Sequence, residues 1–424
     1  MAAAAADTGP SVASGPQHES AMASVLAALL PRFEALERSF ERLAARLPED
    51  LEARLVAAVR GALSPAGGDR KLEEAHHSGG GAAAAPGVAS TNAGTLARAG
   101  AEVGVLARTG PFSYCVNRGK PSFDAAFRAL ADANPGYEGG ALFTYFDTYG
   151  GKQLPELGWW PRQVQLIDRN VTNDFDNKRT FAQQLQSAGC EQAFAQTHFT
   201  VQEALRASEG CLDALFFVKS PHGTAGRDMH VATREELQRR PVQDGYVLQR
   251  AVQDLTLIDG RKFVVRFFAL IHDGVVLAHR RAVAIVHGPF YERDSTDYDV
   301  QICHDTAKAG SEVRCCALDS LPDGAAWHCA IAQRLMEIMP ALQPLCDRSS
   351  ADRYAVLGLD ALIDDRGEAR LIETNMYPNL WDFNEDINVR VKQAMLRDVL
   401  ARVLLGQSPA ELQPVDIAAS TPQA

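Results

Sequence analysis

The stretch YAVLGLDALIDDRGEARLIETNMYPNL, residues 354–380, decides the fold of this chain. Two apolar runs flank the Asp-Asp-Arg-Gly segment 364–367, which is typical of a turn, so the stretch predicts a β-hairpin. Side chains two positions apart on a strand point to the same face. We therefore expect Asp360 on the first strand to project together with Glu373 and Asn375 on the second.

The register of this hairpin sets the spacing of the acids. If Ile363 pairs with Glu368, Asp360 lies opposite Leu371 and is the diagonal neighbour of Glu373, at roughly 7–8 Å. Oxygen ligands of this kind suit Mg²⁺, which prefers carboxylates, water and nucleotide phosphates. The alternative is a solvated hairpin with a polar outer face. The apolar residues on both sides of the acids favour the metal site.

Composition excludes several classes of function. The chain has 424 residues, is 46% hydrophobic and carries a net charge of −11, a balance that disfavours nucleic-acid binding through basic excess. Its eight cysteines form no CxxC pair, so we expect free thiols in a reducing compartment and no zinc site. No segment has the roughly 18 apolar residues of a membrane span. The N-terminus resembles neither a signal nor a transit peptide, which predicts a cytoplasmic protein without a membrane partner.

The first hundred residues are expected to lie outside the catalytic body. Residues 1–20 have the composition of a disordered tail. Between Leu26 and Leu47, leucines and phenylalanines alternate at spacings of three and four, so we expect an amphipathic helix or coiled coil over 21–63. The seam suits either homo-oligomerisation or packing on the protein's own body. Residues 64–110 read as a Gly/Ala/Ser-rich flexible linker.

From about residue 111 to 408 the pattern is that of an α+β domain, followed by a tail at 409–424. The sequence His272-Asp273-Gly274 predicts a hairpin between strands 263–271 and 275–286. Antiparallel hairpins mixed with helices indicate α+β layers and not a doubly wound parallel sheet. The other expected strands are 112–116, 163–167, 214–218 and 246–248, and the expected helices lie near 122–132, 178–187, 325–340 and 384–405.

Two segments suggest contacts with a nucleotide. In LFFVKSPHGTAGRDMHV, residues 215–231, a strand ends in Lys219 and leads into a loop with Gly223 and Gly226. A lysine beside free backbone N–H groups can cradle phosphates, although such a stretch is often an ordinary turn. In the strand YVLQRAV, Gln249 stands where the chain leaves the sheet and could border an adenine.

Further cations gather on the next strands. Lys262, Val264 and Arg266 share one face of an apolar strand, which favours an anion as their partner. Arg280 and Arg281 follow on the paired strand, and alternation alone leaves open which of them points inward. Lys178 opens a helix and is the least specific of these cations.

These motifs in this order resemble the tubulin–tyrosine ligase-like branch of the ATP-grasp enzymes. The resemblance covers about residues 112–405. It rests on the lysine–glycine loop, on LIDGRKF at 257–263, and on Asp360 followed thirteen residues later by Glu-x-Asn. It implies an ATP-grasp fold, with a nucleotide held between two α+β subdomains, and ligation of an amine to a carboxylate through an acyl-phosphate.

The resemblance also assigns roles to residues. Mg²⁺ and ATP are the implied cofactors, a free amino acid and a protein carboxylate the implied substrates, and tubulin or another acidic protein tail the implied partner, which would place the protein at microtubules. By position the metal ligands are Asp360, Glu373 and Asn375; the ATP contacts are Lys178, Lys219, Gly223, Gly226 and Gln249; the catalytic cations are Lys262, Arg266 and Arg280.

The chain departs from the family at two points. Val264 stands where the family usually has an acid, and Cys303-His304 stand where it usually has Thr-Asn. Both departures put tyrosine as the amine in doubt, and leave open which amino acid and acceptor are used. Two alternatives therefore stay open: a ligase for a small-molecule or other peptide carboxylate, and a non-catalytic tubulin-binding module.

Overall fold

The computed structural model of the protein describes residues 105–146, 155–211, 213–223, 226, 228–302, 312–380 and 384–415. All of them belong to one compact unit that spans Asn92–Ala424. The expected tail 1–20, the helical segment 21–63 with its 26–47 seam and most of the linker 64–110 lie outside the described residues, as do Cys303 and His304.

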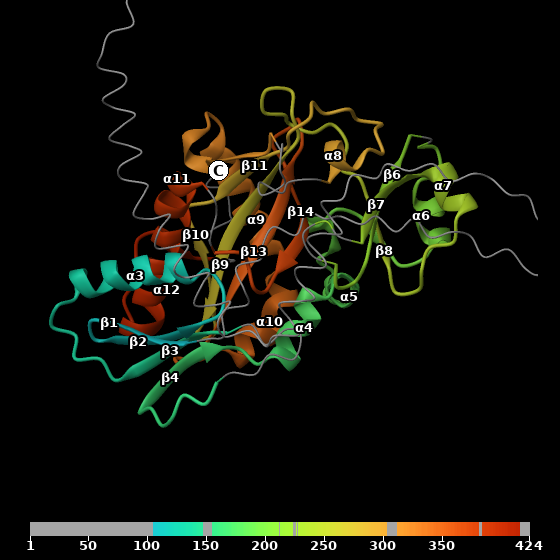
Figure 1. Ribbon diagram of the computed structural model, residues 1–424. Helices are drawn as coiled ribbons and strands as arrows, with labels where there is room; N and C mark the ends of the chain where they lie inside the picture. Colours follow the sequence, from blue (N-terminus) through green and yellow to red (C-terminus); the bar gives the residue numbers. More distant parts are fainter. Residues whose placement is uncertain are drawn as a thin grey trace, which may run out of the picture. The chain divides into compact units, whose positions relative to one another are not determined.

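A large mixed sheet organises the body. Its path runs β1-β2-β3-β4-β13-β9-β10-β15, with β11 and β12 continuing beside β9 and β14 beside β13 (Figure 1). The pairs from β2 to β4 and the pair β4–β13 are parallel and the others antiparallel. The predicted α+β class is confirmed. The strands are β1 (Val105–Thr109), β2 (Phe112–Val116), β3 (Ala141–Tyr145), β4 (Arg162–Leu166), β9 (Phe263–His272), β10 (Val275–His279), β11 (Val283–Val286), β12 (Arg314–Ala317), β13 (Arg353–Ile363), β14 (Ala369–Asn375) and β15 (Leu412–Pro414).

Both ends of the sheet extend beyond the expected boundaries of 111 and 408. β1 pairs with β2, and Thr109 lies opposite Phe112 across the turn between them. β15 pairs with β10, with Leu412 opposite His279. The segment expected to begin the C-terminal tail at 409 therefore contributes a strand.

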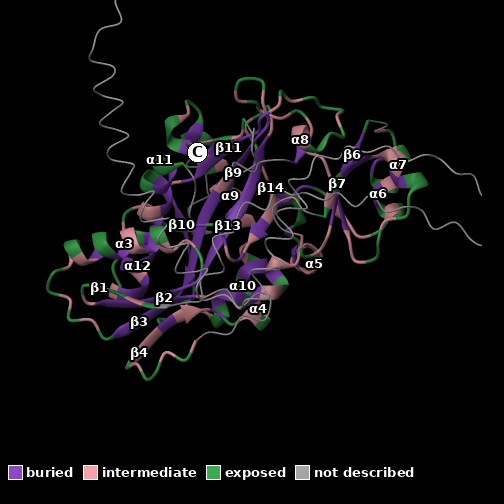
Figure 2. Cartoon of the chain, viewed as in Figure 1, coloured by how far each residue is buried: buried purple, intermediate pink, exposed green. Residues whose placement is uncertain are grey.

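Helices cover both faces of this sheet, and its central strands are accordingly buried (Figure 2). Phe268 packs in one core with α3 and α12, while Phe267 packs in another with α9 and α10. Within the described part, no helix is long and apolar enough to cross a membrane. The elements are α3 (Lys120–Ala133), α4 (Arg169–Asp176), α5 (Lys178–Ser187), α9 (Gly324–Glu337), α10 (Met339–Arg348), α11 (Glu385–Ile387), a π-helical stretch (Asn388–Gln393), α12 (Ala394–Leu405) and two 3₁₀ turns (Glu191–Ala193, Leu318–Ser320).

A second, four-stranded antiparallel sheet carries two short helices. Its order is β5-β8-β6-β7. Phe216 and Val218 of β6 pack against the helices, so Phe217 and Lys219 point to the opposite face, where Phe217 packs near Ile302, directly after α8. Both helices begin with a Thr-x-x-Glu capping box, which satisfies N–H groups at the helix start. The bounds are β5 (Thr197–His198), β6 (Leu215–Lys219), β7 (Met229–Thr233), β8 (Val247–Arg250), α6 (Val201–Ala207), α7 (Arg234–Arg239) and α8 (Tyr298–Gln301).

The acid-bearing hairpin forms as predicted, but its register differs. Ile363 pairs with Ala369, not with Glu368, and a β-bulge between Asp360 and Ala361 shifts the pairing again. Asp360 therefore lies directly opposite Glu373 and not opposite Leu371. The residue left over on β14 is Ile372, because Ala361 pairs with Leu371 and Asp360 with Glu373.

The prediction of one continuous strand over residues 275–286 is wrong. The segment is broken into β10 and β11, because the chain takes five steps from Ala278 to Val283 while β9 takes three from Ala269 to Arg266. The extra residues interrupt the strand pairing at Arg280. Strand alternation therefore cannot say whether Arg280 or Arg281 points inward.

Candidate functional site

Lys219 ends β6 and lies on the face of the small sheet that meets the large one. Its side chain is buried, with 5% of the residue exposed. Its Nζ donates to Gln249 Oε1 at 2.6 Å and to the Ile372 carbonyl at 3.4 Å. Burial disfavours the charged form and lowers the pKa of Lys219 to about 8, although Glu373 partly opposes this shift.

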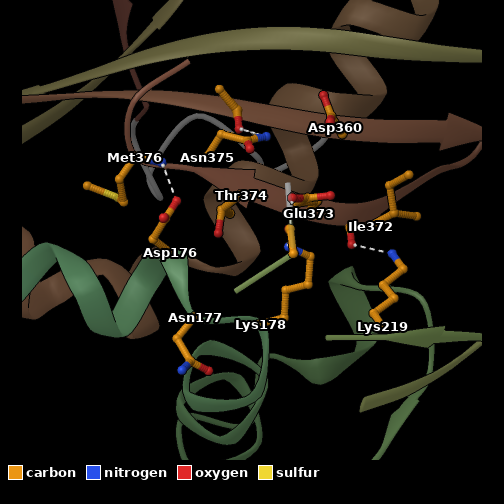
Figure 3. A network of polar contacts seen from close by, with 12 residues as sticks. Asp176, Asn177, Lys178, Lys219, Asp360, Ile372, Glu373, Thr374, Asn375 and Met376 are labelled. Carbon is orange, nitrogen blue, oxygen red and sulfur yellow. Dashed lines mark hydrogen bonds and ion pairs between the residues drawn. The ribbon is translucent and has the colours of Figure 1, made fainter. Parts of the chain in front are cut away.

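Lys178 is the first residue of α5, and Asn177 caps that helix by accepting hydrogen bonds from two backbone N–H groups. Lys178 Nζ lies 3.0 Å from Glu373 Oε1 and donates to the carbonyl of Gly223 at 2.5 Å. This lysine therefore connects the glycine loop to the acidic hairpin, as Figure 3 shows for the acid.

The glycine loop lies close against α8. Gly226 has φ +70°, and a Cβ on it would lie 2.6 Å from the hydroxyl oxygen of Tyr298. A side chain at this position would require both a left-handed backbone and displacement of Tyr298. The two predicted loop residues, Gly223 and Gly226, are thus found between α5 and α8.

Asp360 and Glu373 are paired across the hairpin, and Figure 3 shows Lys178 approaching Glu373. The guanidinium of Arg266 grips Asp360 with two hydrogen bonds, one of them from Nη2 to Oδ2 at 2.9 Å. Asn375 lies two residues beyond Glu373, and its Nδ2 donates to the Gly358 carbonyl at 3.5 Å. The structure therefore places all three predicted metal ligands together.

Two further contacts anchor the end of β14. Thr374 Oγ1 donates to the carbonyl of Phe175 at 2.9 Å, and the N–H of Met376 donates to Asp176 Oδ1 at 3.3 Å (Figure 3). The strand that carries the acids is thus fixed to the C-terminal end of α4.

The carbonyl of Ile372 is a hydrogen-bond acceptor of this cluster that sequence reasoning missed. It accepts hydrogen bonds from Lys219 and, at 3.2 Å, from Gln249 Nε2. Gln249 Nε2 also lies 3.4 Å from Thr197 Oγ1, which sequence reasoning missed as well. A backbone carbonyl at a bulge cannot be recognised from the amino-acid sequence. A single threonine in a two-residue strand gives only a weak sequence signal.

Lys262 is buried and is held by α8. Its Nζ donates to the Gln301 carbonyl at 2.8 Å and to Oε1 of the same residue at 3.2 Å. The ring of Phe217 lies 4.8 Å from the ammonium. Burial, with a smaller effect of Lys219, lowers the pKa of Lys262 to about 7. Val264, two residues on, is buried with 5% exposed.

The charges of the site depend on one another. Burial opposes ionisation of Glu373, but Lys178 and Lys219 hold its pKa below the usual range. Burial likewise opposes the charge of Arg266, and Asp360 outweighs it and raises the pKa of the guanidinium. Lys178, Lys219 and Arg266 thus face two carboxylates, and Lys262 adds a further basic group near Lys219. This excess of basic groups suits an anionic ligand.

The structure does not bring Arg280 into this group, contrary to the prediction. Arg280 is exposed at the break after β10. Its Nη2 and Nε donate to the side-chain oxygen of Gln413, on β15, at 2.6 and 3.0 Å once that amide is oriented with its oxygen toward the guanidinium. Arg281 donates from Nη1 to the Arg390 carbonyl at 2.7 Å. Neither arginine has a described contact with the acids.

A narrow cavity of about 30 Å³ lies among these groups, and a wider groove of about 580 Å³ adjoins it. The cavity has the volume of about one water molecule in the liquid, whereas ligand pockets usually measure about 300–1,000 Å³. Lys178, Lys219, Gln249 and Glu373 are among the residues that line the cavity. The cavity and the groove share Ala182, Leu185, Phe194 and Thr197; the groove adds Arg250, Ala251 and Val252 from the end of β8, among others.

The donor set fits a hard cation. Two carboxylates and an amide on one face offer oxygen ligands of the type that Mg²⁺ prefers. Among the described residues there is no group of three or more His, Cys, Asp or Glu side chains able to hold a metal. A metal at this site therefore depends on Asn375 and on oxygens from a ligand in addition to Asp360 and Glu373.

Comparisons with known proteins give likenesses among solved structures but none in sequence. No family model matches the sequence, and no curated protein matches it. Among solved structures, the C-terminal domain from K. lactis Pby1 is similar, and it is described as an ATP-grasp enzyme interacting with the mRNA decapping enzyme Dcp2. It is 14% identical, with a TM-score of 0.49, and the match covers 72% of this chain and 98% of that chain.

Proposed function

We propose that this protein is an ATP-grasp ligase that uses ATP to join an amine to a carboxylate. The observation that carries the proposal is the meeting of Lys178 and Lys219 with Asp360 and Glu373. Lysines from the small sheet and from α5 thus line one cavity together with Glu373 of the large sheet, and Asp360 lies opposite Glu373 on the neighbouring strand. This arrangement suits a triphosphate that carries a divalent cation.

In this proposal different residues would bind the phosphates, the base and the metal ion of the nucleotide. Lys178 and Lys219 would neutralise phosphate oxygens, with the loop at Gly223 and Gly226 closing over them. The groove beside Gln249 would receive the base. Asp360, Glu373 and Asn375 would hold Mg²⁺, which supplies charge neutralisation at the phosphates.

The proposed reaction has two steps, and the cations of the site would stabilise the charge that develops in them. The carboxylate oxygen of the acceptor forms a bond to the γ-phosphorus, and ADP leaves. The amine nitrogen then forms a bond to the acyl carbon, phosphate leaves and the amine gives up a proton. Lys262 and Arg266 would stabilise the negative charge that develops on the transferred phosphoryl and acyl oxygens, and closure of the loop would keep water away from the acyl-phosphate.

The acceptor we propose is a carboxylate on an acidic peptide, such as a tubulin tail, and the amine that of a free amino acid. The excess of cations at the site supports this class of acceptor in a chain of net charge −11. The protein would then act in the cytoplasm, at microtubules if tubulin is the acceptor. Binding of such a peptide should weaken with salt, because exposed charges are screened over about 8–10 Å.

A coupled assay for ADP tests the proposal. The full-length protein is given ATP, Mg²⁺, each standard amino acid, and either a glutamate-rich peptide or a neutral peptide of the same length. We expect ADP release that requires both amine and peptide, with a KM for the acidic peptide that rises with ionic strength. A preference for the neutral peptide, or a KM that does not change with salt, would remove the acidic-tail acceptor and leave a ligase for another carboxylate.

A second candidate is a nucleotide-binding module without catalysis that docks an acidic tail. Val264 favours it, since this buried residue replaces an acid usual in the family that the sequence resembles. Nucleotide binding without ADP release under any combination of substrates would support the module.

A further inference from the structure

Gln249 joins the small sheet to the acidic hairpin through its side-chain amide. Its Oε1 accepts from Lys219 Nζ at 2.6 Å, and its Nε2 lies 3.2 Å from the Ile372 carbonyl and 3.4 Å from Thr197 Oγ1. The residue is buried, with 5% exposed. A glutamine amide has two N–H donors, and these two contacts use both of them.

The hydrogen bond from Gln249 to Ile372 matters because Ile372 is the bulged residue of β14. Ile372 is the unpaired residue of β14 between Leu371, which pairs with Ala361, and Glu373, which pairs with Asp360. A shift of one residue in a strand turns every side chain to the opposite face. The extra residue is therefore what brings Glu373 opposite Asp360, and its carbonyl accepts bonds from the other sheet.

Resting on the proposed function, we infer that Gln249 is a positioning residue for the metal site. By holding the Ile372 carbonyl it fixes the bulge, and through the bulge it fixes the direction of the Glu373 carboxylate. The same amide holds Lys219, so one side chain sets the spacing between a phosphate-binding lysine and a metal-binding acid.

This role differs from contact with the base. Both N–H groups of Gln249 are engaged within the protein, so an adenine nitrogen that needs a donor would compete with the Ile372 carbonyl and Thr197. The groove that could receive a base is lined by the following residues, Arg250, Ala251 and Val252.

Binding of a fluorescent ATP analogue, followed while Mg²⁺ is titrated, distinguishes the two roles without any turnover. Gln249→Met keeps the length of the side chain and removes the three side-chain hydrogen bonds to Lys219, Ile372 and Thr197. We expect it to raise the Mg²⁺ concentration for half-maximal binding by about 10–100-fold, the usual effect of losing a residue that orients a metal ligand. The preference for ATP over GTP in competition should stay that of the wild type. Gln243→Met, an exposed glutamine of the same region, is the matched control and should change neither quantity.

Two further variants keep the test decisive if Gln249→Met fails to fold, which thermal unfolding without nucleotide would reveal. Gln249→Glu retains an acceptor for Lys219 but places a carboxylate against the Ile372 carbonyl, so it should also raise the Mg²⁺ requirement. Thr197→Val removes the third contact and the bond from Thr197 Oγ1 to the Ala195 carbonyl, but leaves Gln249 bonded to Lys219 and Ile372, so it should have a smaller effect than the Gln249 variants. A Gln249 variant with the wild-type Mg²⁺ requirement, or with an altered ATP to GTP preference alone, would overturn the inference. A wild-type protein that binds no Mg²⁺-nucleotide would instead overturn the proposed function.

Discussion

Asp360 lies directly opposite Glu373 across the β13–β14 hairpin, and the bulge at Ile372 is what brings the two carboxylates into line. Directly opposed residues have Cβ atoms about 4.5–5.5 Å apart, closer than the roughly 7–8 Å of diagonal neighbours. The closer pair can share one cation. Arg266 forms an ion pair with Asp360, and Lys178 forms one with Glu373.

Glu373→Gln should abolish most of the ligase activity while the protein stays folded. The variant removes one of two carboxylates at the metal site, and electrostatic losses of this kind lower rates by about 10²–10³-fold. ADP release at saturating Mg²⁺ measures the effect. Glu368→Gln, on the same hairpin but exposed and paired with Arg334, is the control and should keep wild-type activity. Wild-type turnover by Glu373→Gln would contradict the metal assignment.

Arg266 and Arg280 should differ sharply when each is changed to lysine. Arg266→Lys loses the two-pronged grip on Asp360, a loss of about 1.5–3 kcal/mol in the free energy of unfolding, and should lower ADP release. Arg280→Lys, at an exposed position beside Gln413, should change stability by less than about 0.5 kcal/mol. Denaturant unfolding and the coupled assay measure both. Equal losses of activity in the two variants would show that Arg280 belongs to the site after all.

Binding of ATP should weaken as pH rises above neutrality. Burial lowers the pKa of Lys262 to about 7 and that of Lys219 to about 8. A bound triphosphate favours the charged lysines and so raises both pKa values. Binding then takes up protons, and the contribution is complete below pH 7 and is lost as pH rises through the pKa values of the bound state. Dissociation constants measured from pH 6.5 to 9 should rise for the wild type and less steeply for Lys262→Met. Parallel curves would contradict this linkage.

The N-terminal segment should govern assembly and not catalysis. Because β1 begins at Val105 and pairs with β2, a deletion of residues 1–104 spares the sheet, whereas one that reaches 108 would remove most of β1. We expect the shortened protein to keep its ATP turnover and to lose self-association that depends on the Leu26–Leu47 seam. Light scattering on both proteins measures the assembly state. A full-length protein that is monomeric at micromolar concentration would contradict the self-association.

The hairpin and the shared face of its polar residues could be predicted from the sequence because their signals are local. Alternation places Asp360 on one face and Glu373 with Asn375 on the matching face, and Gly367 ends the turn with φ +80°. Lys178, Lys219 and Gln249 were also found where the motifs put them. The bulge at Ile372 could not be predicted, because one extra residue in an apolar strand changes no composition and no spacing signal.

The break between β10 and β11 was missed for a related reason. Apolar residues continue on both sides of Arg280, so the pattern suggests one long strand, and only pairing with β15 and β12 shows that there are two. The partners of the buried cations depend on tertiary packing as well. Gln301, which accepts hydrogen bonds from Lys262, lies in a helix of four residues. Such a short helix shows no hydrophobic periodicity in the sequence.

Transfer of oxygen from the acceptor to phosphate is the most direct test of the proposed ligase. The peptide acceptor that supports ADP release is prepared with ¹⁸O in its carboxylates, and the phosphate released with ATP, Mg²⁺ and the amine is examined by ³¹P NMR or mass spectrometry. Formation of an acyl-phosphate predicts one ¹⁸O atom in the phosphate for every amide bond formed. Unlabelled phosphate would show that water and not the carboxylate receives the phosphoryl group, and would contradict the account.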